Sequence, residues 1–296
     1  MTVAARIAGG LMAFPVTPFA ADGGLDRDGF AAHCAHLLDH GPSGLVVAGG
    51  AGEFHALTPA EVATLARDAR PLTPAPLIVG CGYGAALAVE IARAAEAAGA
   101  DALLLMPPYL VGCPQAGLEA HVRAVCAATG LDVILYHRAN ALFAADTVAR
   151  LADACPTLVG FKDGAGDVAL VRALAARLGD RLLLLGGMPT HEIYAEAHAA
   201  AGARVYSSSV FSFAPRLALR FHGAFARGDR AACDAMLRDF FLPFARIRDR
   251  QPGHAVAILK AALRLLGRPA GPVRPPLADL TAEEHAMLEP LLEHAR

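Results

Sequence analysis

The sequence predicts an α/β fold, a (β/α)8 TIM barrel followed by a C-terminal helical extension. Short apolar runs alternate along the chain with longer segments, such as residues 25–41 and 86–100, in which apolar residues recur at helical spacing. Each run is apolar nearly throughout, which is typical of parallel strands covered on both faces. Eight strand-then-helix units predict a barrel of parallel strands surrounded by helices. The eight runs are residues 10–19, 44–54, 76–82, 102–109, 132–138, 158–164, 181–188 and 204–210.

The strand pattern stops after about residue 215, and the remaining chain has helical spacing. Three segments carry that spacing, at residues 221–248, 253–267 and 281–295, with a proline-rich connector between the last two. We therefore place the catalytic barrel at residues 1–225 and the helical extension at residues 226–296. The length of 296 residues is sufficient for this fold as one unit.

The composition argues against several classes of partner. Hydrophobic residues make up 55% and charged residues 18%, which is typical of a compact globular protein. A formal net charge of −2 provides no basic surface for nucleic acid. The uncharged window at residues 71–89 is interrupted by prolines and glycines, so we expect no membrane span. We find no secretion signal at the N-terminus, and the six scattered cysteines form no C-x-x-C motif, so we expect reduced thiols in a cytoplasmic protein.

The chemistry of a (β/α)8 barrel lies at the carboxyl ends of its strands, and one of these ends carries a lysine. Lys162 lies near the end of the sixth run and is one of two lysines in the chain, against 24 arginines. An amine inside a barrel mouth loses hydration and its pKa falls, so the neutral form can attack a ketone and form a Schiff base. Arginine cannot do this because its guanidinium stays protonated. The alternative is a structural ion pair between Lys162 and Asp163 or a neighbouring carboxylate.

Neighbouring strand ends add further side chains to the candidate site. Tyr136 lies near the end of the preceding run, where its hydroxyl would relay protons, although a core tyrosine with a satisfied hydroxyl is the alternative. The glycine-rich turn at residues 49–53 offers backbone N–H groups to a carboxylate. Arg138 is a candidate for a second carboxylate, with a salt bridge at the rim as the alternative. The remaining candidate substrate-binding residues are Gly50, Ala51, Gly186, Ser207, Ser208 and Ser209.

Three other patterns favour neither a nucleotide nor a metal. The glycines at residues 80–84 lack the G-x-G-x-x-G spacing of a dinucleotide turn. The segment 191–198 is not H-E-x-x-H, because alanine stands at position 195. His33, His36 and His40 share one helical face, where a zinc site is possible and helix packing is the favoured alternative. We predict no metal and no nucleotide cofactor.

The lysine, the tyrosine and the glycine-rich turn together resemble the dihydrodipicolinate synthase / N-acetylneuraminate lyase superfamily over nearly the whole chain. Within it the chain is most similar to the branch of the 5-dehydro-4-deoxyglucarate dehydratases. The resemblance implies that Lys162 forms the Schiff base, that Tyr136 relays protons, and that Gly50 and Ala51 bind a carboxylate. It also implies a homo-oligomer, usually a tetramer, with Tyr109 at a subunit interface. The segments that carry it are residues 49–54, 103–110, 161–167, 187–192, 206–213 and 267–280.

Four positions depart from the branch. Ala51 stands where a threonine is usual, His137 where an asparagine is usual, Ser209 where an alanine is usual and Ser212 where an asparagine is usual. The change at Ala51 removes a hydroxyl from the carboxylate-binding turn. Ser209 would restore a hydroxyl to the mouth of the barrel. These departures leave the lysine and the tyrosine in place and bear on the choice of substrate.

The resemblance implies a lyase that dehydrates and decarboxylates 5-dehydro-4-deoxy-D-glucarate, a keto-diacid, to 2,5-dioxopentanoate. The lysine would act as a covalent Schiff base, so no further cofactor is expected. One alternative is a pyruvate-dependent aldolase or synthase of the same superfamily, which would use the same lysine to make or break a carbon–carbon bond. A second alternative is a non-catalytic barrel that binds sugar acids, which the missing hydroxyl at Ala51 keeps open.

Overall fold

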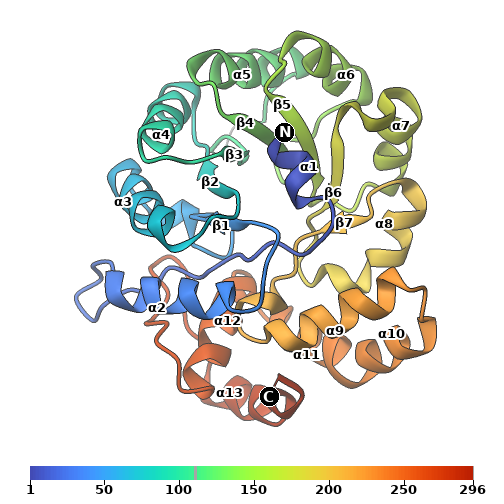
Figure 1. Ribbon diagram of the computed structural model, residues 1–296. Coiled ribbons are helices and arrows are strands. Elements are labelled where there is room, and N and C mark those ends of the chain that lie inside the picture. Colours follow the sequence, from blue (N-terminus) through green and yellow to red (C-terminus); the bar gives the residue numbers. More distant parts are fainter. Residues whose placement is uncertain (110–111, 296) are drawn as a thin grey trace.

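The computed structural model describes residues 1–109 and 112–295. Leu110, the last residue of the segment 103–110 named above, lies outside the described residues. Within the described part the chain forms a barrel of parallel strands ringed by helices, and the helices that follow the barrel gather on one side of it (Figure 1).

The predicted barrel is confirmed, with one difference in how it closes. Seven parallel strands form one sheet in chain order among the described residues. The first predicted run supplies the eighth place through single bridges, Met12 to Ser207 on one side and Ala13 to Leu45 on the other. The strands are β1 (Leu45–Val47), β2 (Leu77–Cys81), β3 (Ala102–Leu105), β4 (Asp132–His137), β5 (Leu158–Asp163), β6 (Leu183–Gly186) and β7 (Val205–Tyr206).

The helices follow the strands as predicted and continue beyond the barrel. Thr58 begins one of them with a reciprocal capping box to Glu61, and Pro59 occupies its first position. The helices are α1 (Val3–Ile7), α2 (Arg27–Leu38), α3 (Pro59–Ala69), α4 (Ala85–Ala97), α5 (Gln115–Ala128), α6 (Ala145–Ala154), α7 (Val168–Leu178), α8 (Ala195–Ala201), α9 (Pro215–Ala226), α10 (Arg230–Met236), α11 (Leu242–Arg248), α12 (His254–Leu265) and α13 (Ala282–Leu288). A π-helical turn, Leu237–Phe241, joins α10 to α11.

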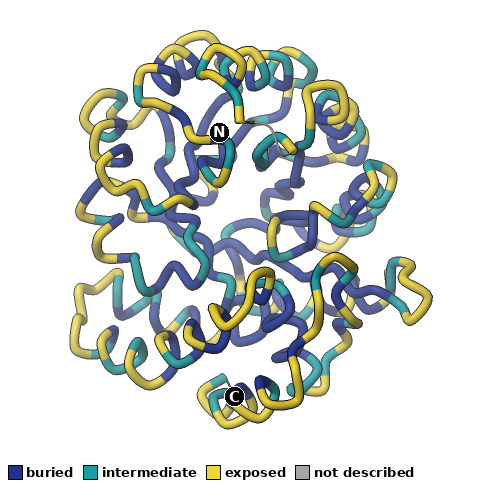
Figure 2. Tube along the Cα trace, turned by 180° about the vertical axis from the view of Figure 1, so that it is seen from behind, coloured by how far each residue is buried: buried dark blue, intermediate teal, exposed yellow. Residues whose placement is uncertain are grey.

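Alternation along the strands separates two hydrophobic clusters. In β1, Val46 faces the barrel interior, while Leu45 and Val47 pack under the surrounding helices. The interior cluster also contains Tyr136 of β4 and is closed at the amino ends of the strands by α1, whose Val3 N–H donates to the Asp132 carboxylate at the start of β4. In Figure 1, α1 lies over the centre of the barrel. The strands are buried and the helices are exposed on their outer sides (Figure 2).

The C-terminal extension is packed on the barrel through buried polar contacts. Lys260 of α12 forms an ion pair with Glu53, the last residue of the glycine-rich turn, at 2.6 Å between Nζ and Oε1. The backbone N–H of Arg274 donates to the other oxygen of Glu53. The extension therefore holds the turn that follows β1. The division between barrel and extension at residue 225 falls at the end of α9.

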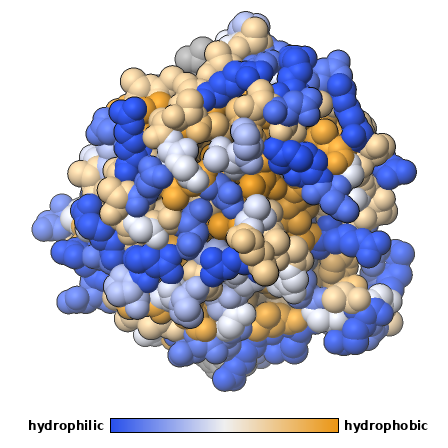
Figure 3. Space-filling view, turned by 45° about the horizontal axis from the view of Figure 1, so that its top comes forward, coloured by the Kyte–Doolittle hydropathy of each residue, from blue (hydrophilic) through white to orange (hydrophobic). Residues whose placement is uncertain are grey.

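The surface of the described residues is mixed in character. Hydrophilic side chains are spread over the face seen in Figure 3, with apolar ones between them. No helix of the described part is long and apolar enough to cross a membrane. All six cysteines are free thiols. Within the same residues, no group of three or more His, Cys, Asp or Glu side chains is arranged to hold a metal ion.

Candidate active site

A cavity of about 390 Å³ opens at the carboxyl ends of the strands, as the barrel fold requires. Its lining includes Lys162, Tyr136 and Arg138 together with the turn residues Gly50 and Ala51. Ser207 and Ser209 line it from the segment after β7. Strand register explains why the lysine and the tyrosine meet: Tyr136 pairs with Lys162 across β4 and β5, so both side chains point to the same face.

The Lys162 amine lies in a buried, largely aromatic setting. The residue is 5% exposed, and Nζ lies 4.5 Å from the ring centroids of both Phe14 and Tyr136. Burial, and then the nearby Arg138 charge, lower the Lys162 pKa from 10.5 to about 7. A large share of the amine is therefore neutral near pH 7, which is the form that attacks a ketone.

The structural alternative for Lys162 fails on geometry. Asp163 faces the other way, with Oδ2 2.9 Å from Nε2 of the buried His198 and Oδ1 accepting from the N–H groups of Ala165 and Gly166. Lys162 forms no ion pair with any carboxylate among residues 1–109 and 112–295. The lysine is therefore held by packing rather than by a partner charge.

Tyr136 is placed between a hydrogen-bond acceptor and a hydrogen-bond donor. Its hydroxyl donates to the Gly187 carbonyl at 3.1 Å and accepts from Arg138 Nη1 at 3.0 Å. The tyrosine is 4% exposed, yet its hydroxyl borders the cavity beside the lysine. A phenol with one donor and one acceptor at hand can pass a proton to or from a bound substrate.

Two glycines make room for these side chains. A Cβ at Gly187 would lie 2.6 Å from Lys162 Cε, and a Cβ at Gly164 would lie 2.5 Å from the Tyr136 ring. Both distances are below any normal contact. The positions after the strand ends around Lys162 are therefore glycine because the Lys162 and Tyr136 side chains occupy the space.

The glycine-rich turn presents free backbone amides to the cavity. The N–H groups of Gly50 and Ala51 make no hydrogen bond with the rest of the described chain. Ala48 and Glu53, on either side of these amides, have positive φ values of 51° and 57°. Non-glycine residues adopt this region at a cost, and it persists where surrounding contacts enforce it. Glu53 is enforced by Lys260 and Arg274, so the turn is preformed.

Two of the predicted substrate-binding residues lie elsewhere. Ser208 is fully buried, and its hydroxyl donates to the Glu192 carboxylate rather than facing the cavity. Gly186 does not line the cavity; a Cβ there would lie 2.0 Å from the His191 ring. Tyr109, predicted at a subunit interface, is 67% exposed in the single chain, and its place at an interface stays a prediction.

The structure adds residues that the sequence patterns did not indicate. Arg248, at the end of α11, reaches the cavity while its guanidinium is held by Asp249 and by the Thr190 hydroxyl. Val256 and Leu259 of α12 supply an apolar wall, so the extension forms part of the site. An Arg–Asp pair at a helix end is too common to be recognised as a signal from sequence.

Comparison with known proteins identifies the family of the chain. The family model described as "Dihydrodipicolinate synthetase family" matches residues 7–295. The chain belongs to the dihydrodipicolinate synthetase family. It is 52% identical, over 99% of its length and 98% of the relative's, to a Rhizobium meliloti protein named "Probable 5-dehydro-4-deoxyglucarate dehydratase".

Solved structures of the family share the whole fold. Dihydrodipicolinate synthase from Bacillus clausii superposes with a TM-score of 0.89 at 26% identity, covering 98% of each chain. An E. coli K12 prophage protein of the dihydrodipicolinic acid synthase family, in complex with pyruvate, superposes with a TM-score of 0.84 at 28% identity, covering 97% of this chain and 98% of the other. The fold of nearly the whole chain, including the helices after the barrel, is therefore shared with these two structures.

Proposed function

We propose that the chain is a Schiff-base lyase that converts 5-dehydro-4-deoxy-D-glucarate to 2,5-dioxopentanoate, water and carbon dioxide. The observation that carries the proposal is the buried Lys162 amine, which lies at the barrel mouth without a partner charge among the described residues. A relative that is 52% identical to the chain bears the name of this activity. The substrate is a six-carbon diacid with a ketone beside one carboxylate, a methylene next to the ketone and two hydroxyls beyond it.

The first half of the reaction is an elimination. The neutral Lys162 amine adds to the ketone and water leaves, which gives an iminium. The iminium withdraws electrons from the adjacent methylene, and the Tyr136 hydroxyl or a water beside it takes one of the methylene protons. The electron pair of that C–H bond forms a carbon–carbon double bond as the next hydroxyl leaves with a proton, as water.

The second half releases carbon dioxide. The double bond extends the conjugation of the iminium toward the far end of the molecule, so the electron pair of the bond to the distal carboxylate flows toward the nitrogen. Carbon dioxide leaves, the resulting dienamine takes up protons, and hydrolysis returns the lysine and frees the product. The lysine serves as electron sink in both halves, and atoms and electrons balance without a further redox partner.

Two anchors suit the two carboxylates of the substrate. The free amides of Gly50 and Ala51 suit the carboxylate beside the ketone. Arg138 suits the distal carboxylate, because it forms no ion pair with a described carboxylate, whereas Arg248 is already paired with Asp249. The Ser209 hydroxyl lines the same cavity and replaces the hydroxyl that Ala51 lacks.

Carbon dioxide release from the ketodiacid tests the proposal, with Lys162→Arg as the variant and Arg93→Lys, an exchange at an exposed position of α4, as the control. Arginine keeps the charge and cannot form an imine, so Lys162→Arg should release none, while Arg93→Lys should retain most activity. Borohydride added during turnover should fix substrate carbon to the wild-type chain at Lys162.

Two other outcomes would favour the alternative functions. Pyruvate fixed at Lys162, without carbon dioxide released from the ketodiacid, would favour the aldolase; the related prophage protein was solved in complex with pyruvate. Substrate binding that is unchanged in Lys162→Arg, without turnover in any form, would favour a binding barrel.

The same proposal includes a homo-oligomer of four chains. Tyr109 is an aromatic side chain that is 67% exposed, and it follows β3 by four residues, after Met106 and Pro107, which line the cavity. Exposed aromatic residues of this kind are typical of interfaces. Light scattering should give the mass of a tetramer, and Tyr109→Ala should reduce it; a wild-type monomer at assay concentration would remove Tyr109 from the site.

A further inference from the structure

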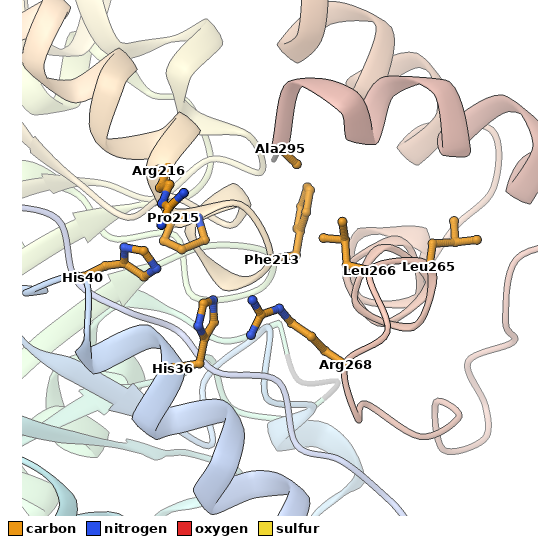
Figure 4. Close-up of a pocket in the computed structure, with 9 residues that line it drawn as sticks. All are labelled: His36, His40, Phe213, Pro215, Arg216, Leu265, Leu266, Arg268 and Ala295. Atoms are coloured by element: carbon orange, nitrogen blue, oxygen red, sulfur yellow. The ribbon is translucent and has the colours of Figure 1, made fainter.

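A second cavity, of about 400 Å³, lies outside the barrel between α2, the start of α9 and the end of α12. One wall carries His36 of α2 and His40, two residues beyond the end of that helix, with ring centroids 5.1 Å apart. Phe213, Leu265 and Leu266 give it an apolar side. Figure 4 shows that Arg268 extends across the cavity toward His36, while His40 and Arg216 border the same space.

The charged groups around this cavity are of one sign. Arg216 and Arg268 line it, and no carboxylate of the described residues does. Neither guanidinium forms an ion pair or a hydrogen bond with the described part of the chain, whereas Arg264 and Arg274 each hold a carboxylate. Asp39, at the end of α2, acts on both histidines from outside the lining, and burial together with Arg268 lowers the His36 pKa. The cavity therefore concentrates positive charge that the protein does not balance.

The backbone adds to this potential. Helix α9 has 12 residues and begins beside the cavity, where its N-cap Ala214 supplies no side-chain acceptor. The first-turn N–H groups of a helix have no partner within the helix, and they form its positive end. The amides of Arg216 and Leu217 have no backbone acceptor among the described residues. A cation is repelled here, so the histidine face does not serve a metal ion.

We propose that this cavity binds a small multivalent oxyanion, either a phosphate ester or a dicarboxylate. Guanidinium groups bind phosphate and carboxylate oxygens in paired hydrogen bonds, and each histidine can add a donor. The apolar wall of Phe213, Leu265 and Leu266 suits a short carbon skeleton attached to the anionic group. The site is separate from the barrel mouth, with which it shares no lining residue.

Calorimetric titration with inorganic phosphate and with succinate tests the proposal. Both titrations use a background with Lys162→Met and Arg138→Ala, which removes the amine and one guanidinium from the barrel mouth, where a dicarboxylate would also bind. The background protein should bind at least one of the two probes, and Arg216→Ala combined with Arg268→Ala should weaken that binding at least about tenfold. Tighter binding of phosphate assigns a phosphate ester, and tighter binding of succinate assigns a dicarboxylate.

The matched control is Arg93→Ala, which removes an exposed arginine of α4 that forms no ion pair among the described residues. It should leave binding unchanged. An unchanged melting temperature without probe shows that the double variant is folded. Equal binding by the double variant, or no binding of either probe by the background protein, would overturn the proposal.

Discussion

Replacing Lys162 by methionine should abolish turnover and at the same time stabilise the fold. Burial lowers the Lys162 pKa from 10.5 to about 7, and at 1.36 kcal/mol per pH unit that difference corresponds to about 5 kcal/mol. The free-energy cost is complete below pH 7, where the lysine is charged in both the folded and the unfolded state. It shrinks as pH rises from 7 to 10.5 and disappears above that. Methionine fills the same space without the charge, so we expect a gain of at least about 2 kcal/mol at pH 7.

Replacing the second lysine, Lys260, is a control for which we expect the opposite change in folding stability. Lys260 is also buried, but its Nζ lies 2.6 Å from Glu53 Oε1, and both side chains are fully buried. Removing one partner of such a pair leaves a buried charge alone, so Lys260→Met should cost about 3–5 kcal/mol.

The test is urea unfolding of wild type and both variants at pH 7 and pH 10, which gives their free energies of unfolding, with activity measured alongside. The gain in Lys162→Met should be smaller at pH 10 than at pH 7. Destabilisation of Lys162→Met to the extent of Lys260→Met would refute the reasoning and make Lys162 a structural residue.

Four further outcomes follow from the same cavity. Tyr136→Phe should lower kcat about 10²–10⁴-fold while borohydride still fixes substrate at Lys162, and wild-type turnover would remove Tyr136 from the proton relay. In wild type, kcat/KM should rise with pH through about 7, because the neutral Lys162 amine is the reactive form; a flat profile between pH 6 and pH 8 would contradict its lowered pKa. Arg138→Ala should move that rise to higher pH, since the Arg138 charge helps to lower the Lys162 pKa, and an unmoved profile would discount this effect. Gly187→Ala should sharply reduce imine trapping because its Cβ meets Lys162 Cε at 2.6 Å, whereas Gly84→Ala, with nothing within 4 Å, should not.

The fold could be predicted because each strand has an apolar sequence of its own, but strand lengths could not. The run at residues 10–19 forms only bridges, and Pro15 and Pro18 lack the N–H groups that a longer ladder needs. The run at residues 44–54 gives a strand of three residues, because Ala48 turns to positive φ immediately after it. Both shortened strands result from backbone properties, namely missing proline N–H groups and a positive φ, which the apolar pattern does not reveal. Neither changes the order of the strands.

The candidate site could be predicted only where the alternation of side chains along extended backbone was taken into account. Ser207 and Ser208 cannot both face one cavity, because successive side chains of extended backbone point to opposite sides, and Ser209 has already left extended backbone, with φ of −69° and ψ of −28°. The structure turns Ser208 away to Glu192 and leaves its two neighbours on the cavity. The scarcity of lysine identified a buried amine at Lys162, yet it applies equally to Lys260, which serves an ion pair. Rarity therefore indicates burial, and position in the barrel indicates chemistry.

The attachment of the extension to the glycine-rich turn also has a consequence for synthesis of the chain. The contact between Glu53 and the Arg274 backbone spans 221 residues, so the turn emerges from the ribosome long before the groups that hold it. Until Lys260 and Arg274 arrive, the Glu53 carboxylate has no buried partner, and the positive φ of its backbone has no support. A chain interrupted before α12 contains every strand of the barrel and still lacks the groups that hold the glycine-rich turn.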